Sequence, residues 1–215
     1  HAHSESSLVF PSEFARMAVI HGTVATVSDP HEIANVCGIE GVQFMLDNAE
    51  GVPFYFNIGA PSCVPATHHE TSGADLDASS LKPLLENPKI KYLAEMMNFP
   101  GVINRDPTVM DKIALAHKLG KKIDGHAPGL TGDNAIKYFE TGITTDHECF
   151  MLNEALEKLA LGVHILIREG SAARNFDTLI PTLAQYPNQI MFCSDDKHPD
   201  SLQIGHINQL VSRAV

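Results

Sequence analysis

The sequence predicts an α/β fold, a TIM-like (β/α)8 barrel. Short β-rich apolar runs alternate along the chain with longer segments that have helical patterns. Successive strand–helix units are roughly 25–30 residues apart, which is typical of this barrel. Polar residues follow the ends of the predicted strands, which is where barrels of this class place their chemistry. Residues 1–215 are therefore expected to form one domain, a catalytic barrel.

The predicted strands are rich in Val, Ile, Phe and Thr. Near-continuous apolar runs of this kind are expected where a strand is buried on both faces, as in a parallel sheet covered by helices. The predicted strands are Thr23–Ser28, Pro53–Ile58, Ile90–Leu93, Lys122–Asp124, Ile143–Thr145, Val163–Arg168 and Gln189–Cys193.

Helix-like segments lie between these strands, and some carry capping signals. The segment Thr108–Leu119 follows Asp106 and Pro107, an N-cap residue with proline at the first helical position, and Gly120 closes it. The longest irregular stretch is expected at Gly59–Ala78, and a long loop in a compact domain is usually functional. The other predicted helices are Asn134–Glu140 after an N-cap at Asp133, Asn153–Ala160, and Phe176–Gln185.

The composition is that of an ordinary globular protein. The chain is 44% hydrophobic and 19% charged, enough to bury a core. A net charge of -11 argues against a nucleic-acid partner. No apolar run approaches the ~18 residues needed to cross a bilayer, so no membrane partner is expected. The four cysteines are widely spaced and no signal peptide is visible, which predicts a cytoplasmic protein.

The chain begins directly on a candidate metal ligand, His1. A strand that presents such a ligand should have apolar residues before it, so the sequence is expected to be a fragment of a longer protein. Without that first strand, the segments Thr23–Ser28 and Gln189–Cys193 are expected to expose unpaired edges, which promote aggregation. The fragment alone is then expected to be poorly soluble or to bind metal incompletely.

The His1-Ala2-His3 motif points to a metal site. Side chains alternate along an extended backbone, so the two imidazoles lie on the same side. Taken singly, a His after a strand is more often a hydrogen-bonded loop residue, and an acidic residue there, such as Asp196 or Glu148, can be a helix N-cap. A metal site is favoured because further nitrogen and oxygen donors follow strand ends in barrel order, a set that suits Zn, Fe, Mn or Co. The candidate ligands are His1, His3, Glu95, His126, His147 and Asp195.

Seven blocks of sequence, spread in order over the whole chain, carry a family resemblance. On these blocks the chain resembles the amidohydrolase superfamily and, within it, the bacterial adenine deaminases (adenases). The His-x-His and the final Asp are general to the superfamily, whereas the second and fourth blocks are more specific. The blocks are His1-Ala2-His3-Ser4-Glu5-Ser6-Ser7, Ser28-Asp29-Pro30-His31-Glu32-Ile33-Ala34-Asn35-Val36, Pro61-Ser62-Cys63-Val64-Pro65-Ala66 with Glu70-Thr71-Ser72-Gly73-Ala74, Glu95-Met96-Met97-Asn98-Phe99-Pro100-Gly101-Val102, Asp124-Gly125-His126-Ala127-Pro128, Thr145-Asp146-His147-Glu148 and Cys193-Ser194-Asp195-Asp196-Lys197-His198-Pro199.

The resemblance implies a barrel of the metal-dependent hydrolase type that holds two divalent ions, with Mn or Fe favoured over Zn. His1, His3 and Asp195 would hold one ion, His126 and His147 the other, and Glu95 would bridge them. A bridging carboxylate reduces the repulsion between two such ions, and the pair lowers the pKa of a water between them. The resemblance also implies a homo-oligomer and, in longer relatives, a β-sandwich domain that this chain lacks.

The implied reaction is hydrolytic deamination of adenine to hypoxanthine and ammonia. Hydroxide attacks C6 while Asp195 accepts its proton, and ring nitrogen N1 must gain a proton. The acid at N1 is open among Asp29, Glu32, Glu148 and Asp196. The residues expected to line the purine pocket or lie near it are Ser62, Cys63, Glu70 and His31.

Two other functions stay open. One is a related hydrolase that acts on a cyclic amide or a different aminated heterocycle, which a carboxylated lysine on the fourth strand would favour. The sequence has Glu95 at that position, and Lys91 precedes it. The other is a non-catalytic metal-binding scaffold, which is expected to have lost ligands, and none is lost here.

Overall fold

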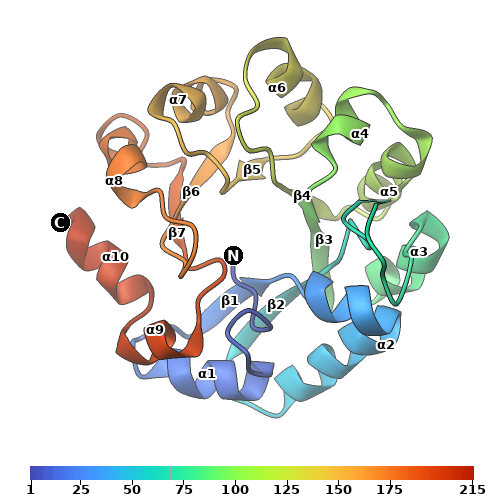
Figure 1. The fold of residues 1–215 in the computed structure, drawn as a ribbon, viewed down its shortest axis with the longest axis horizontal. Helices are drawn as coiled ribbons and strands as arrows, with labels where there is room; N and C mark the ends of the chain where they lie inside the picture. Colours follow the sequence, from blue (N-terminus) through green and yellow to red (C-terminus); the bar gives the residue numbers. More distant parts are fainter. Residues whose placement is uncertain (68) are drawn as a thin grey trace.

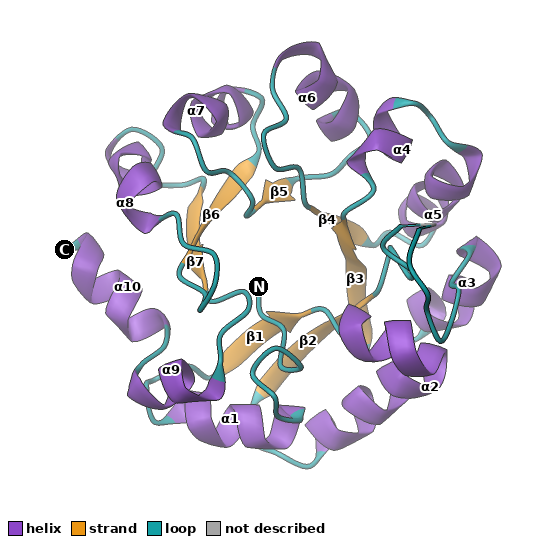
Figure 2. Cartoon of the chain, viewed as in Figure 1, coloured by secondary structure: helices purple, strands orange, loops and turns teal. Residues whose placement is uncertain are grey.

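Parallel strands and helices alternate around a ring in the computed structural model, which describes residues 1–67 and 69–215 (Figure 1). The strands form the inner wall of the ring, and the helices lie outside it (Figure 2). This arrangement confirms the predicted parallel α/β architecture. The strands are β1 (Ala25–Ser28), β2 (Tyr55–Ala60), β3 (Ile90–Met96), β4 (Lys122–Gly125), β5 (Thr145–Asp146), β6 (His164–Arg168) and β7 (Ile190–Cys193).

Most strands are followed by at least one helix, as in a chain of βα units. Within the part of the chain that the structure describes, no helix is both long enough and apolar enough to cross a bilayer. The helices are α1 (Pro11–Val19), α2 (His31–Glu50), α3 (Ala78–Glu86), α4 (Phe99–Ile103), α5 (Pro107–Lys118), α6 (Gly132–Phe139), α7 (Leu152–Ala160), α8 (Phe176–Leu179), the 3-10 helix η1 (Ile180–Ala184), α9 (Pro199–Ile204) and α10 (Ile207–Ala214).

The strands pair in two parallel sheets, β1-β2-β3-β4 and β5-β6-β7. An isolated parallel bridge between Ile123 and Ile143 joins the sheets on one side. On the other side Ala2 bridges both Ser28 and Asp195. The ring is therefore continuous through short bridges, and the complete eight-stranded barrel stays a prediction.

The first residues correct in part the expectation that β1 and β7 are left unpaired, because they bridge the two strands at their carboxyl ends. The Ala2 N–H donates to the Val27 carbonyl (3.0 Å), and the Asp195 N–H donates to the His1 carbonyl (3.2 Å). The His3 N–H donates in turn to the Asp195 carbonyl (3.4 Å). Three residues thus occupy the place between β1 and β7 at their carboxyl ends, and the edges there are paired.

Several predicted boundaries are wrong by a few residues. Strand β3 continues through Glu95 to Met96, so this acidic residue lies within the strand and does not follow it. The predicted helix Phe176–Gln185 divides into α8 and η1, because Pro181 has no N–H for a continuous helical ladder. Helix α6 begins at Gly132, with Thr131 and not Asp133 at its N-cap.

The capping signals at α5 are confirmed, and buried apolar side chains fill the space between strands and helices. The Asp106 side chain accepts from the Thr108 N–H, and proline stands at the start of that helix. Strand β6 contributes the fully buried Ile165 and Ile167, as expected for a strand covered on both faces. This packing gives the carboxyl ends of the strands a rigid base.

Candidate metal centre

Glu95 lies at the centre of a group of imidazoles. Its Oε1 is 3.3 Å from His3 Nε2, and its Oε2 is 2.7 Å from His126 Nδ1 and 3.2 Å from His147 Nε2. The Glu95 side chain is only 3% exposed. These side chains come from residues 1–3, from β3 and from the ends of β4 and β5, as the order of the polar strand ends predicts.

Asp195 forms the second carboxylate of the group. Its Oδ1 is 3.4 Å from His1 Nε2 and 3.5 Å from His3 Nε2. Its backbone has a positive φ of 50°, a left-handed conformation that Asp tolerates better than most residues. Arg168 donates through Nη1 to Asp195 Oδ2, which fixes the orientation of this carboxylate.

Hydrogen bonds at Nδ1 orient the first two imidazoles. His3 Nδ1 lies 2.9 Å from the Asp29 carbonyl, which can only accept, so Nδ1 carries the proton. His1 Nδ1 lies 3.0 Å from Asp124 Oδ2. In the neutral rings both Nε2 lone pairs then face inward, and the two Nε2 atoms are only 3.0 Å apart. Two inward lone pairs at this distance are suited to a shared cation.

Groups of donor atoms in this region are close enough to hold an ion. The sets His1–His147–Asp195 and Glu95–His126–His147 each place their donor atoms within 4.8 Å of one another. His147 Nδ1 is buried with no hydrogen-bond partner in the described residues. Imidazole nitrogens with carboxylate oxygens form a donor set suited to Zn, Mn, Fe or Co. These residues therefore fit divalent metal ions.

The shifted pKa values of Glu95 and His147 also indicate that this group of residues favours positive charge. Burial raises the pKa of Glu95, but hydrogen bonds from His126, His147 and His3 outweigh burial and hold this pKa well below its usual value. Burial lowers the pKa of His147, yet the hydrogen bonds to Glu148 and Glu95 raise it well above normal. In the metal-free protein, protons on the imidazoles thus compensate the buried carboxylates. A divalent cation would replace those protons.

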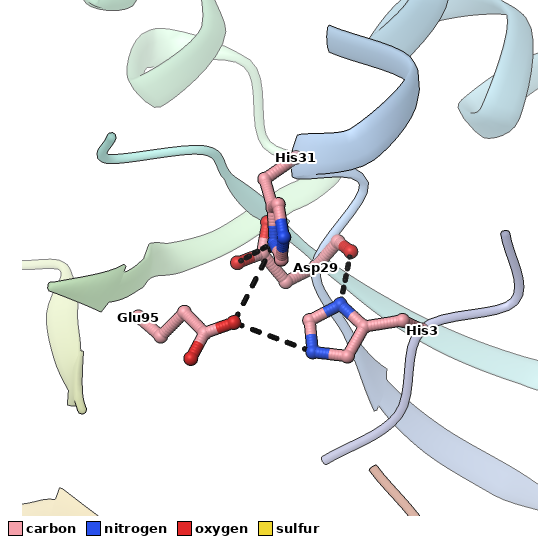
Figure 3. A group of neighbouring side chains, drawn as sticks. All are labelled: His3, Asp29, His31 and Glu95. Atoms are coloured by element: carbon pink, nitrogen blue, oxygen red, sulfur yellow. Dashed lines mark hydrogen bonds and ion pairs between the residues drawn. The ribbon is translucent and has the colours of Figure 1, made fainter. Parts of the chain in front are cut away.

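Asp29 and His31 join the group from the loop after β1 and the start of α2 (Figure 3). His31 Nδ1 is 3.1 Å from Asp29 Oδ2 and 3.5 Å from Glu95 Oε1. Burial lowers the pKa of His31, but the Asp29 charge and hydrogen bond raise it to about 9. Both residues therefore lie beside His3 and Glu95.

Glu148 faces the same group and is tied to Arg168. Its Oε1 is 3.4 Å from His147 Nε2 and 3.7 Å from His126 Nδ1. Arg168 pairs with both of its oxygens, with Nη2 2.9 Å from Oε2. Burial raises the pKa of Glu148, but the His147 hydrogen bond and nearby cationic groups lower it below normal.

Glu32 and Asp196 meet at Ser6. The Ser6 Oγ atom is 2.6 Å from Glu32 Oε1 and 2.6 Å from Asp196 Oδ1. Donor atoms of Asp196 also lie within 4.8 Å of those of His3 and Asp195. The two carboxylates thus lie at the border of the candidate centre.

The residues expected to line the purine pocket do not all lie in one place. Ser62 and Cys63 are buried and line a cavity of about 430 Å³ beside β3. Ser62 Oγ donates to the Glu95 carbonyl (2.5 Å), which connects this cavity to the central carboxylate. Glu70 is exposed, and its Oε1 accepts from the Ala66 N–H (2.7 Å), so the structure does not bring it to the group.

Two residues of the site were not among the predicted functional residues. Asp124 orients His1, and Arg168 pairs with Asp195 and Glu148. Both follow the rule used for the other residues, because each is a charged residue in the last two positions of a strand. Arg168 was missed because a guanidinium is not a metal ligand, and Asp124 was missed because His126 represents that strand end in the predicted ligand set.

The amidohydrolase family profile matches residues 1–209. The chain belongs to the amidohydrolase family. Curated relatives named adenine deaminase are 62% identical over 215 residues in Sulfurovum sp. (strain NBC37-1) and 57% identical over 215 residues in Parabacteroides distasonis. A third, from Methanosarcina mazei, is 58% identical over 214 residues.

This amidohydrolase chain spans 39–40% of the length of those relatives. Among solved structures, it is similar to N-isopropylammelide isopropylaminohydrolase from Burkholderia multivorans, with a TM-score of 0.54 and 17% identity. That similarity covers 94% of this chain and 56% of the other. At this identity the likeness concerns the fold alone.

Proposed function

We propose that the protein carrying this chain hydrolyses adenine to hypoxanthine and ammonia. The observation that carries the proposal is the 62% identity to an adenine deaminase over all 215 residues. The buried group of imidazoles and carboxylates around Glu95 supports it, because hydrolysis at an aromatic carbon needs a strong nucleophile at neutral pH.

We propose that the group holds two divalent ions. His1, His3 and Asp195 would hold one ion, His126 and His147 the other, and Glu95 would contact both. Ions held there would lower the pKa of a water, so that hydroxide would be available near neutral pH. Mn or Fe is favoured by the family resemblance, and Zn also suits these donors.

We propose that Asp195 accepts the proton of the attacking water. Burial raises its pKa, but hydrogen bonds from His1 and His3 and the His147 charge lower it far more, so the carboxylate is ionised in the metal-free protein. Its Oδ2 is oriented by Arg168, which leaves Oδ1 directed at the histidines. Asp195 thus combines the roles of ligand and base.

Glu148 is a poor candidate for the acid that protonates N1 of adenine. That residue pairs with both nitrogens of Arg168, and its lowered pKa disfavours a proton. Asp29, Glu32 and Asp196 are the other carboxyl groups at the border of the centre. We propose that one of these three protonates N1, with His31 beside Asp29 as part of the same wall.

The nearest alternative is hydrolysis of a cyclic amide. A carboxylated lysine in place of Glu95 would favour it, and β3 contains Lys91 upstream. The Lys91 amine instead donates to the Pro88 carbonyl (2.8 Å) at the exposed surface, outside the group around Glu95. The arrangement therefore favours deamination over ring opening.

The proposal also covers cellular location, oligomeric state and partners. A cytoplasmic protein is proposed from the four widely spaced cysteines, and a homo-oligomer is proposed from the family resemblance. Small-molecule substrate and water are its proposed partners.

The experiment uses the intact native protein, depleted of metal and reloaded with Mn²⁺. It should convert adenine to hypoxanthine with one ammonia released, and adenosine should react poorly, because the family's pocket is closed around a free base. A protein that ignores adenine but opens a dihydropyrimidine ring would overturn the proposal and favour the alternative.

A further inference from the structure

Lys158 belongs to the helix labelled α7 in Figure 1. It is a fully buried cation outside the group around Glu95. Its Nζ atom donates to the Ala127 carbonyl (2.6 Å), to Asp146 Oδ2 (2.6 Å) and to Glu154 Oε1 (2.7 Å). An ammonium has three protons, so these three acceptors satisfy it completely. Each acceptor is at a distance typical of a charge-assisted hydrogen bond.

Asp146 connects this amine to the backbone around two candidate ligands. Its Oδ1 accepts from the Ala127 N–H (3.2 Å) and from the Glu148 N–H (3.1 Å). Ala127 directly follows His126, and Asp146 and Glu148 stand on either side of His147. One carboxylate therefore holds the chain next to both histidines.

Glu154 extends the connection further along the same two loops. Its Oε1 accepts from the Gly129 N–H (2.9 Å) after β4, and its Oε2 accepts from the Phe150 N–H (3.4 Å) after β5. Lys158 and Glu154 are one turn apart on α7, so a single helix clamps both loops.

The cluster holds two carboxylates and one ammonium, and that ammonium occupies the place a metal ion would need. Donor atoms of Asp146, Cys149 and Glu154 lie within 4.8 Å of one another, a spacing that could hold an ion. The Lys158 ammonium bonds to both of these carboxylates and so supplies that cation itself. Asp146, Glu154 and Lys158 are each at most 2% exposed, and a buried carboxylate without its cation is strongly destabilising.

We propose that Lys158 is a positioning residue for the metal centre: its contact with the Ala127 carbonyl and with Asp146 fixes the loops that aim His126 and His147 at one ion. This inference rests on the proposed function only in assuming that the centre binds divalent metal. Groups that orient metal ligands typically change metal affinity by about 10–100-fold when they are removed.

A purely electrostatic role would have a different signature from positioning. If Lys158 only offsets charge, removing it together with one negative charge leaves the net charge of the cluster unchanged, so metal binding should stay as in the wild type. If it positions the loops, the same double change recovers part of the stability lost in Lys158→Met, but the lost contact with the Ala127 carbonyl still weakens metal binding at the His126–His147 side. The two roles therefore separate in one double variant.

The test measures divalent metal in the intact native protein, metal-depleted and titrated with Mn²⁺ against a chromophoric chelator. The variants are Lys158→Met and Lys158→Met with Glu154→Gln. The matched control is Glu157→Gln on the same helix, whose Oε2 accepts from the Gly132 N–H (2.9 Å) farther from the centre. Thermal unfolding of each metal-free variant is recorded in parallel.

The double variant should unfold at a higher temperature than Lys158→Met, and it should bind one of two ions about 10–100-fold more weakly than the wild type. The control should bind both ions as the wild type does. A double variant that folds and keeps wild-type affinity for both ions would overturn the inference. A wild type that binds both ions but leaves adenine unchanged would refute the proposed function and leave the inference intact, because the metal titration needs no substrate.

Discussion

The rings of His1 and His3 each form an Nδ1 hydrogen bond to a group outside the candidate ligands, whereas His126 and His147 form hydrogen bonds to such groups through their backbones. The rings of the first pair donate from Nδ1 to Asp124 and to the Asp29 carbonyl, while their backbone pairing is limited to short bridges around Ala2. The difference indicates that one ion of the proposed pair depends on ring orientation and the other on loop position.

For His126 and His147, hydrogen bonds to the backbone fix position. Tyr138 Oη accepts from the His126 N–H (3.0 Å), and Asn175 Nδ2 donates to the His147 carbonyl (3.3 Å). The Lys158 cluster fixes the neighbouring backbone, yet His147 Nδ1 has no hydrogen-bond partner within residues 1–67 and 69–215. Side-chain variants at the two pairs should therefore affect different ions.

Asp195→Asn removes a group that both halves of the mechanism require, so the largest effect is expected here. The amide cannot accept the proton of water and is a weaker ligand, so kcat should fall by more than the roughly 10²–10⁴-fold typical of acid–base catalysis. Ammonia release from adenine is the measurement. Asp177→Asn, at a side chain that is 92% exposed, is the control. Undiminished turnover in the Asp195 variant would refute its role.

Asp124→Asn tests the pair that is held through its rings. The variant keeps the shape of the side chain but loses the carboxylate that orients His1, so one ion should bind about 10–100-fold more weakly. The ion that we assign to His126 and His147 should bind as before. Equal loss of both ions in a metal titration would show that the two halves are not independent.

The pH dependence of metal binding sharpens the same comparison. Burial and the His147 charge lower the pKa of His1, but hydrogen bonds to Asp124 and Asp195 raise it above its ordinary value. The metal-free protein therefore holds a proton that an ion must displace, and protons compete better at low pH. The apparent affinity should fall by about tenfold per pH unit for each displaced proton as the pH decreases. Isothermal titration in buffers of different ionisation enthalpy measures that proton release, and a pH-independent affinity without proton release would contradict it.

Tyr138→Phe should have the smallest effect. The variant leaves the His126 N–H and the Met96 carbonyl without the hydroxyl that bonds to both, which should reduce the free energy of unfolding by about 1–3 kcal/mol. Urea unfolding is the measurement, and Tyr55→Phe, at a side chain that is 77% exposed, is the control. If both variants unfold alike, the hydroxyl does not support the His126 loop.

The sequence predicted the parts of the fold that depend on local pattern. Buried apolar runs such as Ile165–Ile167 located the strands, and the Asp106 cap located the start of α5. The pairing of Ala2 with both neighbouring strands was not predictable, because an isolated bridge of one residue has no periodicity.

The residues of the candidate site likewise fall into those that the sequence pattern pointed to and those that it did not. Polar residues at strand ends identified the residues that now lie around Glu95, since topology brings the carboxyl ends of parallel strands together. Lys158 carried no such signal, because a lysine on an amphipathic helix ordinarily faces solvent. Glu70 was associated with the site through its sequence block, and tertiary structure places it at the surface.

Anomalous diffraction from crystals of the intact native protein loaded with Mn²⁺ tests the central claim most directly. The account predicts two peaks near Glu95, one with His1, His3 and Asp195 and one with His126 and His147, at ligand distances of about 2.0–2.2 Å. Peaks elsewhere, with Glu95 in contact with no ion, would contradict it.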